Sequence, residues 1–142
     1  MDNLERWFWL KYQEQIPMEY EIYRNRIDQI LEDGKSEKFK IVTLNDNLRI
    51  LGIGWKVMAT RWFNELSQGI KKEVFDLIWN FSDFNLDNDP YWEHDFWKVQ
   101  LDDTCFLFKI DYYDKTEKYW SEYTSNPSIT HRIMTIMLAN EY

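Results

Sequence analysis

The stretch that decides the fold is residues 94–113, which read HDFWKVQLDDTCFLFKIDYY. Apolar and polar side chains alternate on both sides of the central Asp102-Asp103 pair, a pattern typical of two half-buried antiparallel strands. We therefore predict strands over about 94–101 and 104–113, joined by a two-residue turn. Such a turn needs positive φ, which Asp tolerates less well than Asn or Gly.

A two-residue turn also predicts the register of this hairpin. Trp97 then faces Phe108, and His94 faces Asp111. Because side chains alternate along a strand, one face of the hairpin is expected to be buried. The residues predicted for that face are Trp97, Val99, Leu101, Phe106, Phe108 and Ile110.

The flanking segments predict helices and short strands. Upstream, helices are expected over 36–51 and 68–81, with a strand over 55–60 between them; the apolar stripe of the second helix is Ile70, Val74, Leu77 and Ile78. Residues 82–91 are rich in turn formers and predict a loop. After the hairpin we expect a third strand over about 117–123. A closing helix is predicted from Pro127, capped by Asn126, with Ile129, Ile133, Ile136 and Met137 facing inward.

Residues 2–33 predict two more helices, ended by Gly34. The expected architecture is α+β: a small antiparallel sheet of three to four strands packed by helices, with an N-terminal helical extension. The division into domains places the extension at residues 1–35 and the α+β domain at residues 36–142.

The composition narrows the class of protein. The chain has 142 residues, of which 44% are hydrophobic and 18% aromatic, enough for a packed core. Its single cysteine, Cys105, excludes an internal disulfide and a zinc site built from several thiolates. No signal peptide or membrane span is recognisable. These features favour a cytoplasmic protein in a reducing compartment.

The negative charge is concentrated in one part of the chain. The whole chain has a net charge of −8, and residues 82–126 hold eleven acidic residues against four lysines, a net of −7. This excess disfavours direct binding of nucleic acid or of an anionic membrane there, and favours a basic protein partner or a cation. A simpler explanation is that acidic loops keep a Trp-rich protein soluble.

Several motifs in the second half of the chain resemble a known family. They are Asp87-Asn-Asp-Pro-Tyr91 followed by Glu93-His-Asp-Phe96, then Lys109-Ile-Asp-Tyr-Tyr-Asp114, and Thr135-Ile-Met-Leu-Ala-Asn-Glu-Tyr142. Together, over about residues 41–142, the chain resembles the bacterial domain of unknown function 3768 family. Where that family has glycine, this chain has Trp92, Trp97 and Asp103, which argues against a loop that closely cradles a small ligand. The resemblance implies an association with plasmids and phages.

By analogy, the mobile-element setting implies a role in the contest between such an element and its bacterial host. We therefore expect an acidic inhibitor of the anti-CRISPR or anti-restriction type, which occupies a basic surface of a nucleic-acid-handling protein. Its acids must then gather on one outward patch beside exposed aromatic anchors. The residues expected to contact the partner are Asp87, Asp89, Tyr91, Trp92, Glu93, Asp95, Asp102, Asp103 and Asp114.

Two other functions stay open. In the first, the protein is a metal-assisted hydrolase: His94 beside Asp111 acts as general base together with Glu93, and Asp87 with Asp89 holds a hard cation. The same side chains also suit a purely structural network that fixes the loop to the sheet. In the second, the N-terminal helices mediate self-association through Trp7, Trp9 and Leu10. No cofactor is expected.

Overall fold

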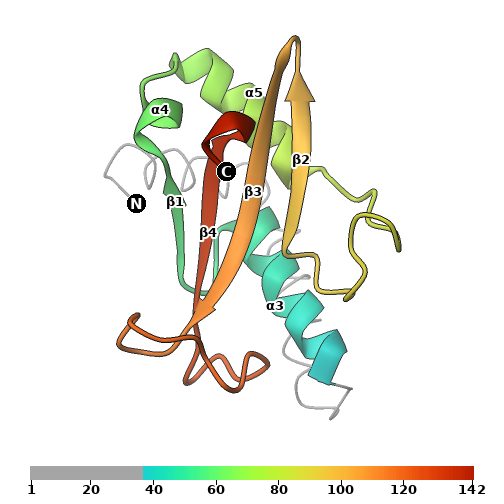
Figure 1. Cartoon of the computed structure of the whole chain (residues 1–142), viewed down its shortest axis with the longest axis vertical. Helices are drawn as coiled ribbons and strands as arrows, with labels where there is room; N and C mark the ends of the chain where they lie inside the picture. Colours follow the sequence, from blue (N-terminus) through green and yellow to red (C-terminus); the bar gives the residue numbers. More distant parts are fainter. Residues whose placement is uncertain (1–36) are drawn as a thin grey trace.

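A computed structural model describes residues 37–142, so the predicted N-terminal helices and their self-association surface lie outside the described residues. The described part is an α+β fold whose helices lie against a four-stranded sheet (Figure 1). Its elements are α3 (Glu37–Leu51), β1 (Lys56–Ala59), α4 (Arg61–Asn64), α5 (Gln68–Trp79), β2 (Phe96–Leu101), β3 (Thr104–Tyr113), β4 (His131–Leu138) and the 3₁₀ turn η1 (Ala139–Glu141).

The hairpin formed by β2 and β3 confirms the predicted register. Trp97 pairs with Phe108, Val99 with Phe106, and Leu101 with Thr104. Val99, Phe106, Phe108 and Ile110 are buried on the predicted face, and Trp97 and Leu101 pack against the same core. The turn uses one positive φ, 51° at Asp102.

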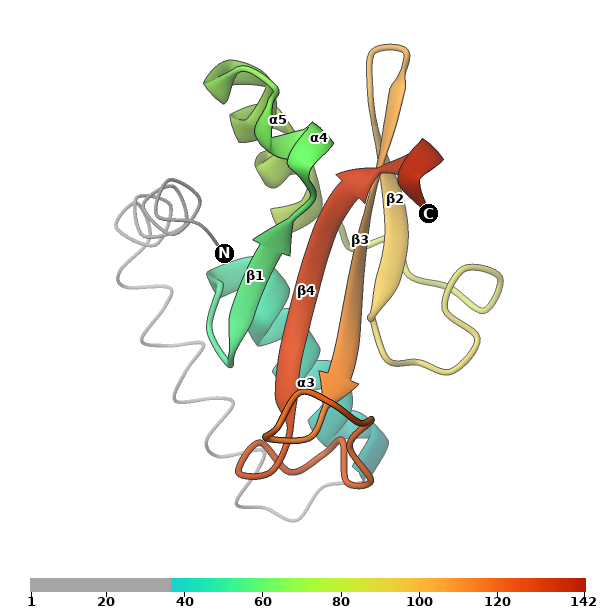
Figure 2. The ribbon, with the colours of Figure 1, turned by 60° about the vertical axis from the view of Figure 1, so that its left-hand side comes forward.

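The C-terminal segment corrects the prediction of a closing helix. Residues from His131 to Leu138 form β4, which lies between β3 and β1 (Figure 2). Met134 and Ile136 are fully buried, and their neighbours Ile133 and Met137 are buried as well. A strand buried on both faces is apolar without alternation, so its pattern is readily mistaken for a buried helix.

The position of β4 also makes the sheet mixed. The strand order is β1-β4-β3-β2, in which β4 runs antiparallel to β3 and parallel to β1. The sequence predicts a purely antiparallel sheet, and the parallel pairing of β1 with β4 corrects that prediction.

The helices α3 and α5 supply the other half of the core. Leu48 of α3 and Val74, Phe75 and Ile78 of α5 are buried together with the hairpin face and β4. The predicted stripe of α5 is partly wrong, because Ile70 is 39% and Leu77 37% exposed. Phe75 and Lys71 lie inward instead, which rotates the buried face of α5 relative to the prediction.

The predicted strand over 117–123 is wrong. This segment pairs with the sheet backbone through one isolated bridge between Tyr113 and Trp120 and otherwise runs as turns, with the Glu117 side chain paired to Lys56 of β1. The buried Thr130 donates its one hydroxyl proton to the carbonyl of Tyr123 and therefore accepts from the Ser121 hydroxyl, which closes this long loop on itself. No helix of the described residues is long and apolar enough to cross a membrane.

Candidate functional site

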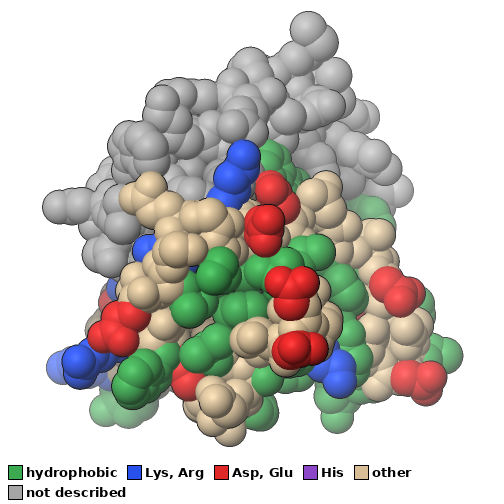
Figure 3. All heavy atoms as spheres, turned by 90° about the horizontal axis from the view of Figure 1, so that it is seen from above, with side chains coloured by type: hydrophobic (Ala, Val, Ile, Leu, Met, Phe, Trp, Pro, Cys, Tyr) green, Lys and Arg blue, Asp and Glu red, His purple; other side chains and the backbone are tan. Residues whose placement is uncertain are grey.

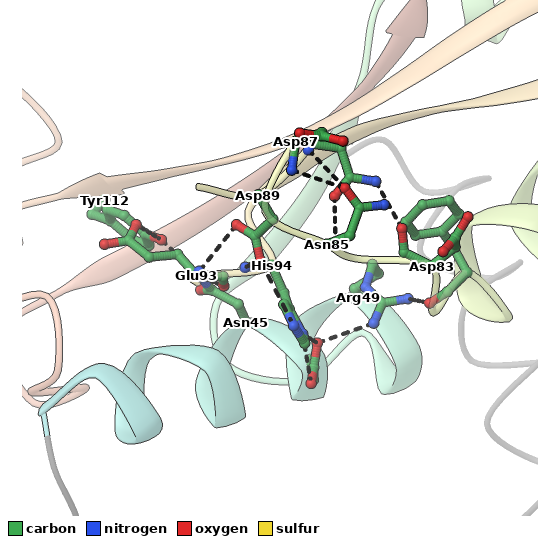
Figure 4. A network of polar contacts seen from close by, with 12 residues as sticks. Asn45, Arg49, Asp83, Asn85, Asp87, Asp89, Glu93, His94 and Tyr112 are labelled. Atoms are coloured by element: carbon green, nitrogen blue, oxygen red, sulfur yellow. Dashed lines mark hydrogen bonds and ion pairs between the residues drawn. The ribbon is translucent and has the colours of Figure 1, made fainter. Parts of the chain in front are cut away.

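The loop over residues 83–95 joins α5 to β2 and carries most of the predicted site residues. Its outer turn is formed by asparagine side chains: Asn85 Oδ1 accepts hydrogen bonds from the amides of Asp87 (2.9 Å) and Asn88 (3.2 Å). Asn88 in turn donates to the Asp83 carbonyl at 2.7 Å. Short amide side chains that bond to nearby backbone are what make such turns. Asp87 lies on the side of this loop turned away from α3 (Figure 4).

Asp89 closes the inner half of the loop. Its side chain is only 3% exposed, and its two carboxylate oxygens accept hydrogen bonds from the backbone amides of Glu93 (3.1 Å) and His94 (3.2 Å). Trp92 and His94 both have positive φ, 56° and 55°. The carboxylate therefore holds a strained backbone in place and is not displayed to a partner.

His94 points toward α3 and not toward Asp111, which corrects the predicted pair. Its Nδ1 lies 2.9 Å from Asp46 Oδ1, and its Nε2 lies 3.7 Å from Asp89 Oδ2 (Figure 4). The ring also stacks on Phe84 with centroids 4.0 Å apart. The hairpin pairing continues only to Asp95, whose carbonyl accepts from the Ile110 amide, and the positive φ of His94 then redirects the chain. Asp111 pairs with Lys109 instead.

A second part of the network is centred on Asn45, which is completely buried. Its Nδ2 donates to the Glu93 carbonyl (2.8 Å) and to the Tyr112 hydroxyl (2.7 Å), and its Oδ1 accepts from Arg132 Nε (2.9 Å). The Tyr112 hydroxyl donates to Glu93 Oε2 at 2.9 Å. Both N–H groups and one lone pair of the oxygen of this amide are used, so both its donor and its acceptor groups have partners in the buried network.

Arg49 links the same network to α5. One guanidinium nitrogen donates to the carbonyls of Ile78 (3.0 Å) and Phe81 (2.6 Å), where α5 ends, and the other donates to Asp46 Oδ1 at 3.0 Å. The cation also lies over the ring of Phe84, 5.2 Å from its centroid. Helix carbonyls without a partner in their own helix are thereby satisfied.

Burial and charge shift the pKa values of this region. Burial, reinforced by the carboxylates of Glu93, Asp89 and Asp111, raises the pKa of Asp95 to about 6. Burial also raises the pKa of Tyr112 and lowers that of Arg132 to about 10. Tyr112 therefore remains a neutral donor at neutral pH, and Arg132 remains a cation.

The predicted partner-binding residues do not form one patch. Asp89 is buried, and Glu93 is engaged with Tyr112 and with Lys38, whose Nζ lies 3.2 Å from it. Asp102 and Asp103 lie at the hairpin tip, whereas Asp114 follows β3 at the opposite end of the sheet (Figure 1). Among the predicted contact residues on the 83–95 loop, Asp87, Tyr91 and Trp92 remain exposed.

The arrangement gives little support to metal binding or base catalysis. In the part of the chain that the structure describes, no group of three or more His, Cys, Asp or Glu side chains is placed to hold a metal ion. Asp89 uses both oxygens on backbone amides, so it does not pair with Asp87 as a cation site. Carboxylates flank both nitrogens of His94. The geometry supports the structural network that the sequence also allowed.

Sequence reasoning missed the residues that hold this network together. The sequence predicts no role in the site for Asn45, Asp46, Arg49 or Arg132, although Leu44-Asn-Asp46 is part of the resemblance to the family. One signal was present: Asn45 directly follows Leu44 within the buried stripe of the predicted 36–51 helix, and a polar residue there needs a partner. Arg132 has no such signal in the sequence, because it falls in the closing helix predicted from Pro127 and outside the inward-facing residues of that helix.

The chain belongs to the family described as "Protein of unknown function (DUF3768)", whose model matches residues 59–141. This confirms the resemblance seen in the motifs, over a shorter stretch than the 41–142 expected. Comparison with curated proteins and with solved structures gave no match.

Proposed function

We propose that this protein works by binding another protein in the cytoplasm of a bacterial host, as an acidic inhibitor of a nucleic-acid-handling defence system. The observation that carries the proposal is the two-sided 83–95 loop. Its inner side is fixed to α3 by His94 and to β3 by Glu93, and Asp89 holds the loop internally by accepting from the Glu93 and His94 amides. Its outer side displays Leu86 (67% exposed), Tyr91 (75%) and Trp92 (49%).

Such a loop has the properties of a binding element. Tyr and Trp dominate the residues that contribute most to protein interfaces. A loop held by a buried network loses little conformational entropy when a partner binds, so more of the contact energy is retained as affinity.

The acids do not gather on the single patch expected from the sequence, so the support that charge gives to a basic partner is local to the 83–95 loop. Asp83 and Asp87 are exposed on this loop, and the chain as a whole has a net charge of −8. Acidic surroundings repel nucleic acid and attract proteins that carry a nucleic-acid-binding surface. The chain resembles a protein family associated with plasmids and phages, and this association supports the inhibitor role by analogy.

The test is capture from a defence-active host, followed by a binding assay with the purified partner. We expect a basic nucleic-acid-binding protein that no longer binds its nucleic acid when this chain is present. The double variant Tyr91→Ser/Trp92→Ser should weaken the complex about 30-fold or more, the effect of losing about 2 kcal/mol at a hot spot. Tyr119→Ser, at an equally exposed ring (71%) beyond β3, is the matched control.

A complex that survives the double variant unchanged would show that the loop is not the binding element. Recovery of no nucleic-acid-binding protein at all would count against the inhibitor role itself.

A further inference from the structure

A groove lies between α5 and the β2–β3 hairpin, and it meets the buried network at Phe81, whose carbonyl accepts a hydrogen bond from Arg49. Its volume is about 800 Å³, and its lining includes Glu73, Asp76, Leu77, Asp83, Leu101 and Asp102. Figure 3 looks onto the end of the molecule that holds the hairpin tip, where hydrophobic surface lies among several acidic side chains. A groove of this size accommodates a few side chains of a ligand.

The floor of the groove is apolar. Leu77 is 37% exposed because α5 turns Phe75 and Ile78 into the core and leaves Leu77 on the outside. Leu101 and Phe81 are half-buried and extend this surface toward the hairpin. The exposed apolar surface therefore has room for an apolar side chain of a partner.

The rim of the groove is acidic on several sides. Four carboxylates line it, and among the described residues no lysine or arginine does so. These carboxylates belong to Glu73, Asp76, Asp83 and Asp102. None of them forms an ion pair with any residue that the structure describes. Their charges are thus available to a ligand, in contrast to the neutralised Asp111 and Glu93.

We propose that this groove binds a basic amphipathic segment of the partner protein, in which Lys or Arg side chains flank an apolar residue. The apolar residue packs on Leu77 and Leu101, and the cations lie between the carboxylates of the rim. This inference rests on the proposed function and specifies the partner's chemistry. Charge complementarity selects the occupant, since a second copy of a chain with a net charge of −8 is repelled.

The groove and the 83–95 loop adjoin at Asp83, which lines the groove and whose carbonyl accepts from Asn88 in the turn of the loop. One partner surface can therefore contact both. Two adjoining contacts on one rigid scaffold strengthen each other without any change of structure.

The test uses the full chain and three synthetic peptides. The first places lysine and arginine around leucine, the second replaces the basic residues by glutamate, and the third replaces leucine by serine. We expect the first peptide alone to bind in calorimetric titration and to shift the amide resonances of Leu77 and Leu101. Raising the salt concentration should weaken this binding.

The variants locate the site. Asp76→Asn and Asp83→Asn should each weaken the first peptide about three- to fivefold, and the double variant roughly tenfold, as expected for partly exposed charge pairs. Leu77→Ser should weaken it about tenfold as well, since the apolar contact is lost. Glu122→Gln, an exposed acid of the loop beyond β3, removes the same charge and should leave affinity unchanged.

Equal binding of the glutamate peptide, or equal binding of the first peptide to the double variant, would overturn the inference. Failure of the two proposals can be told apart. If the variant Asp76→Asn/Asp83→Asn loses affinity for the peptide but still captures the host partner normally, the groove is not the partner's binding site. The 83–95 loop then remains the binding element. If the unmodified chain binds the basic peptide in the groove but captures no host partner, the groove proposal holds and the inhibitor role is wrong.

Discussion

Arg132 Nε donates a 2.9 Å hydrogen bond to Asn45 Oδ1, which joins the central strand β4 to helix α3 inside the protein. Asn45 is 0% and Arg132 3% exposed. The guanidinium also donates to the Thr124 carbonyl and lies over the Tyr112 ring, 5.2 Å from its centroid. A buried cation is thus held by neutral acceptors and a ring, with the Glu93 carboxylate nearby in the same network.

Replacing Asn45 by Ala should destabilise the protein by about 3 kcal/mol, because Arg132 and the Glu93 carbonyl lose their buried partner. Urea unfolding followed by tryptophan fluorescence measures this change. Asn47→Ala is the matched control: it changes the same residue type in the same helix, and its side chain forms no hydrogen bond with the described residues. We expect an effect within about 0.5 kcal/mol there. Equal effects of the two variants would contradict the role given to Asn45.

His94→Ala should loosen the 83–95 loop. The variant loses the contact with Asp46 and the stacking on Phe84, which together are worth about 1–2 kcal/mol. Hydrogen exchange should become faster at the Glu93 and His94 amides, which Asp89 otherwise protects. A double-mutant cycle with Asp46→Asn should give a coupling of about 1 kcal/mol between the two side chains.

The same His94 variant separates the structural role from the hydrolase alternative. If His94→Ala left stability unchanged but abolished a hydrolytic activity that depends on Mg²⁺, Mn²⁺ or Zn²⁺, the catalytic function would be right and the structural one wrong.

Asp95 makes stability depend on pH. Its pKa rises from an ordinary 3.8 to about 6 on folding, so between these values the folded state binds more protons than the unfolded state. The contribution of Asp95 to stability therefore falls as pH rises from about 4 to about 6. Asp95→Asn should stabilise the protein at pH 7 by about 1 kcal/mol, once partial solvent screening is taken into account.

The comparison is thermal or urea unfolding of Asp95→Asn and the unmodified chain at several pH values. The gain should shrink as pH falls toward 4, because Asp95 is then protonated in the unmodified protein too. A gain that is constant across this range would mean that Asp95 is ionised throughout and that its neighbours do not affect it.

Substitution by glycine should have opposite effects on stability at the two adjacent positions of the hairpin turn, Asp102 and Asp103. Asp102 has φ of 51°, which is strained for a residue with a Cβ, whereas Asp103 is not among the residues with positive φ. Asp102→Gly should stabilise the protein by about 0.5 kcal/mol, and Asp103→Gly should destabilise it by about 0.5–1 kcal/mol. Urea midpoints that shift in the same direction for both would contradict this assignment of the turn.

The hairpin could be predicted in detail because its information is local. Alternation fixes which side chains share a face, and the length of the turn fixes which residues pair, so Trp97 opposite Phe108 follows from the sequence alone. Helix α3 and strand β1 were predicted for the same reason. Helix α5 was located, but Leu77 was placed on the wrong side, since several helical faces offered apolar residues.

The exposure of each acidic side chain depends on contacts with distant parts of the chain. Whether a carboxylate faces water or a buried partner depends on contacts such as His94 with Asp46, 48 residues apart. Nothing in the local pattern around Asp87, Asp89 or Glu93 says which of them turns inward. Net charge per segment therefore shows where acidic residues lie along the sequence but not which of them the folded surface displays.

By itself the sequence determined the fold class, the hairpin with its register, the loop at 82–91 and the family. Only the tertiary structure decided that residues 131–138 form an inner strand of the sheet, and that Asn45, Arg49 and Arg132 connect the 83–95 loop, α3, α5 and β4. The physical reason is that a run of apolar residues suits a helix or a doubly covered strand equally well. The choice between them is made by the neighbours β1 and β3, which lie far away in the chain.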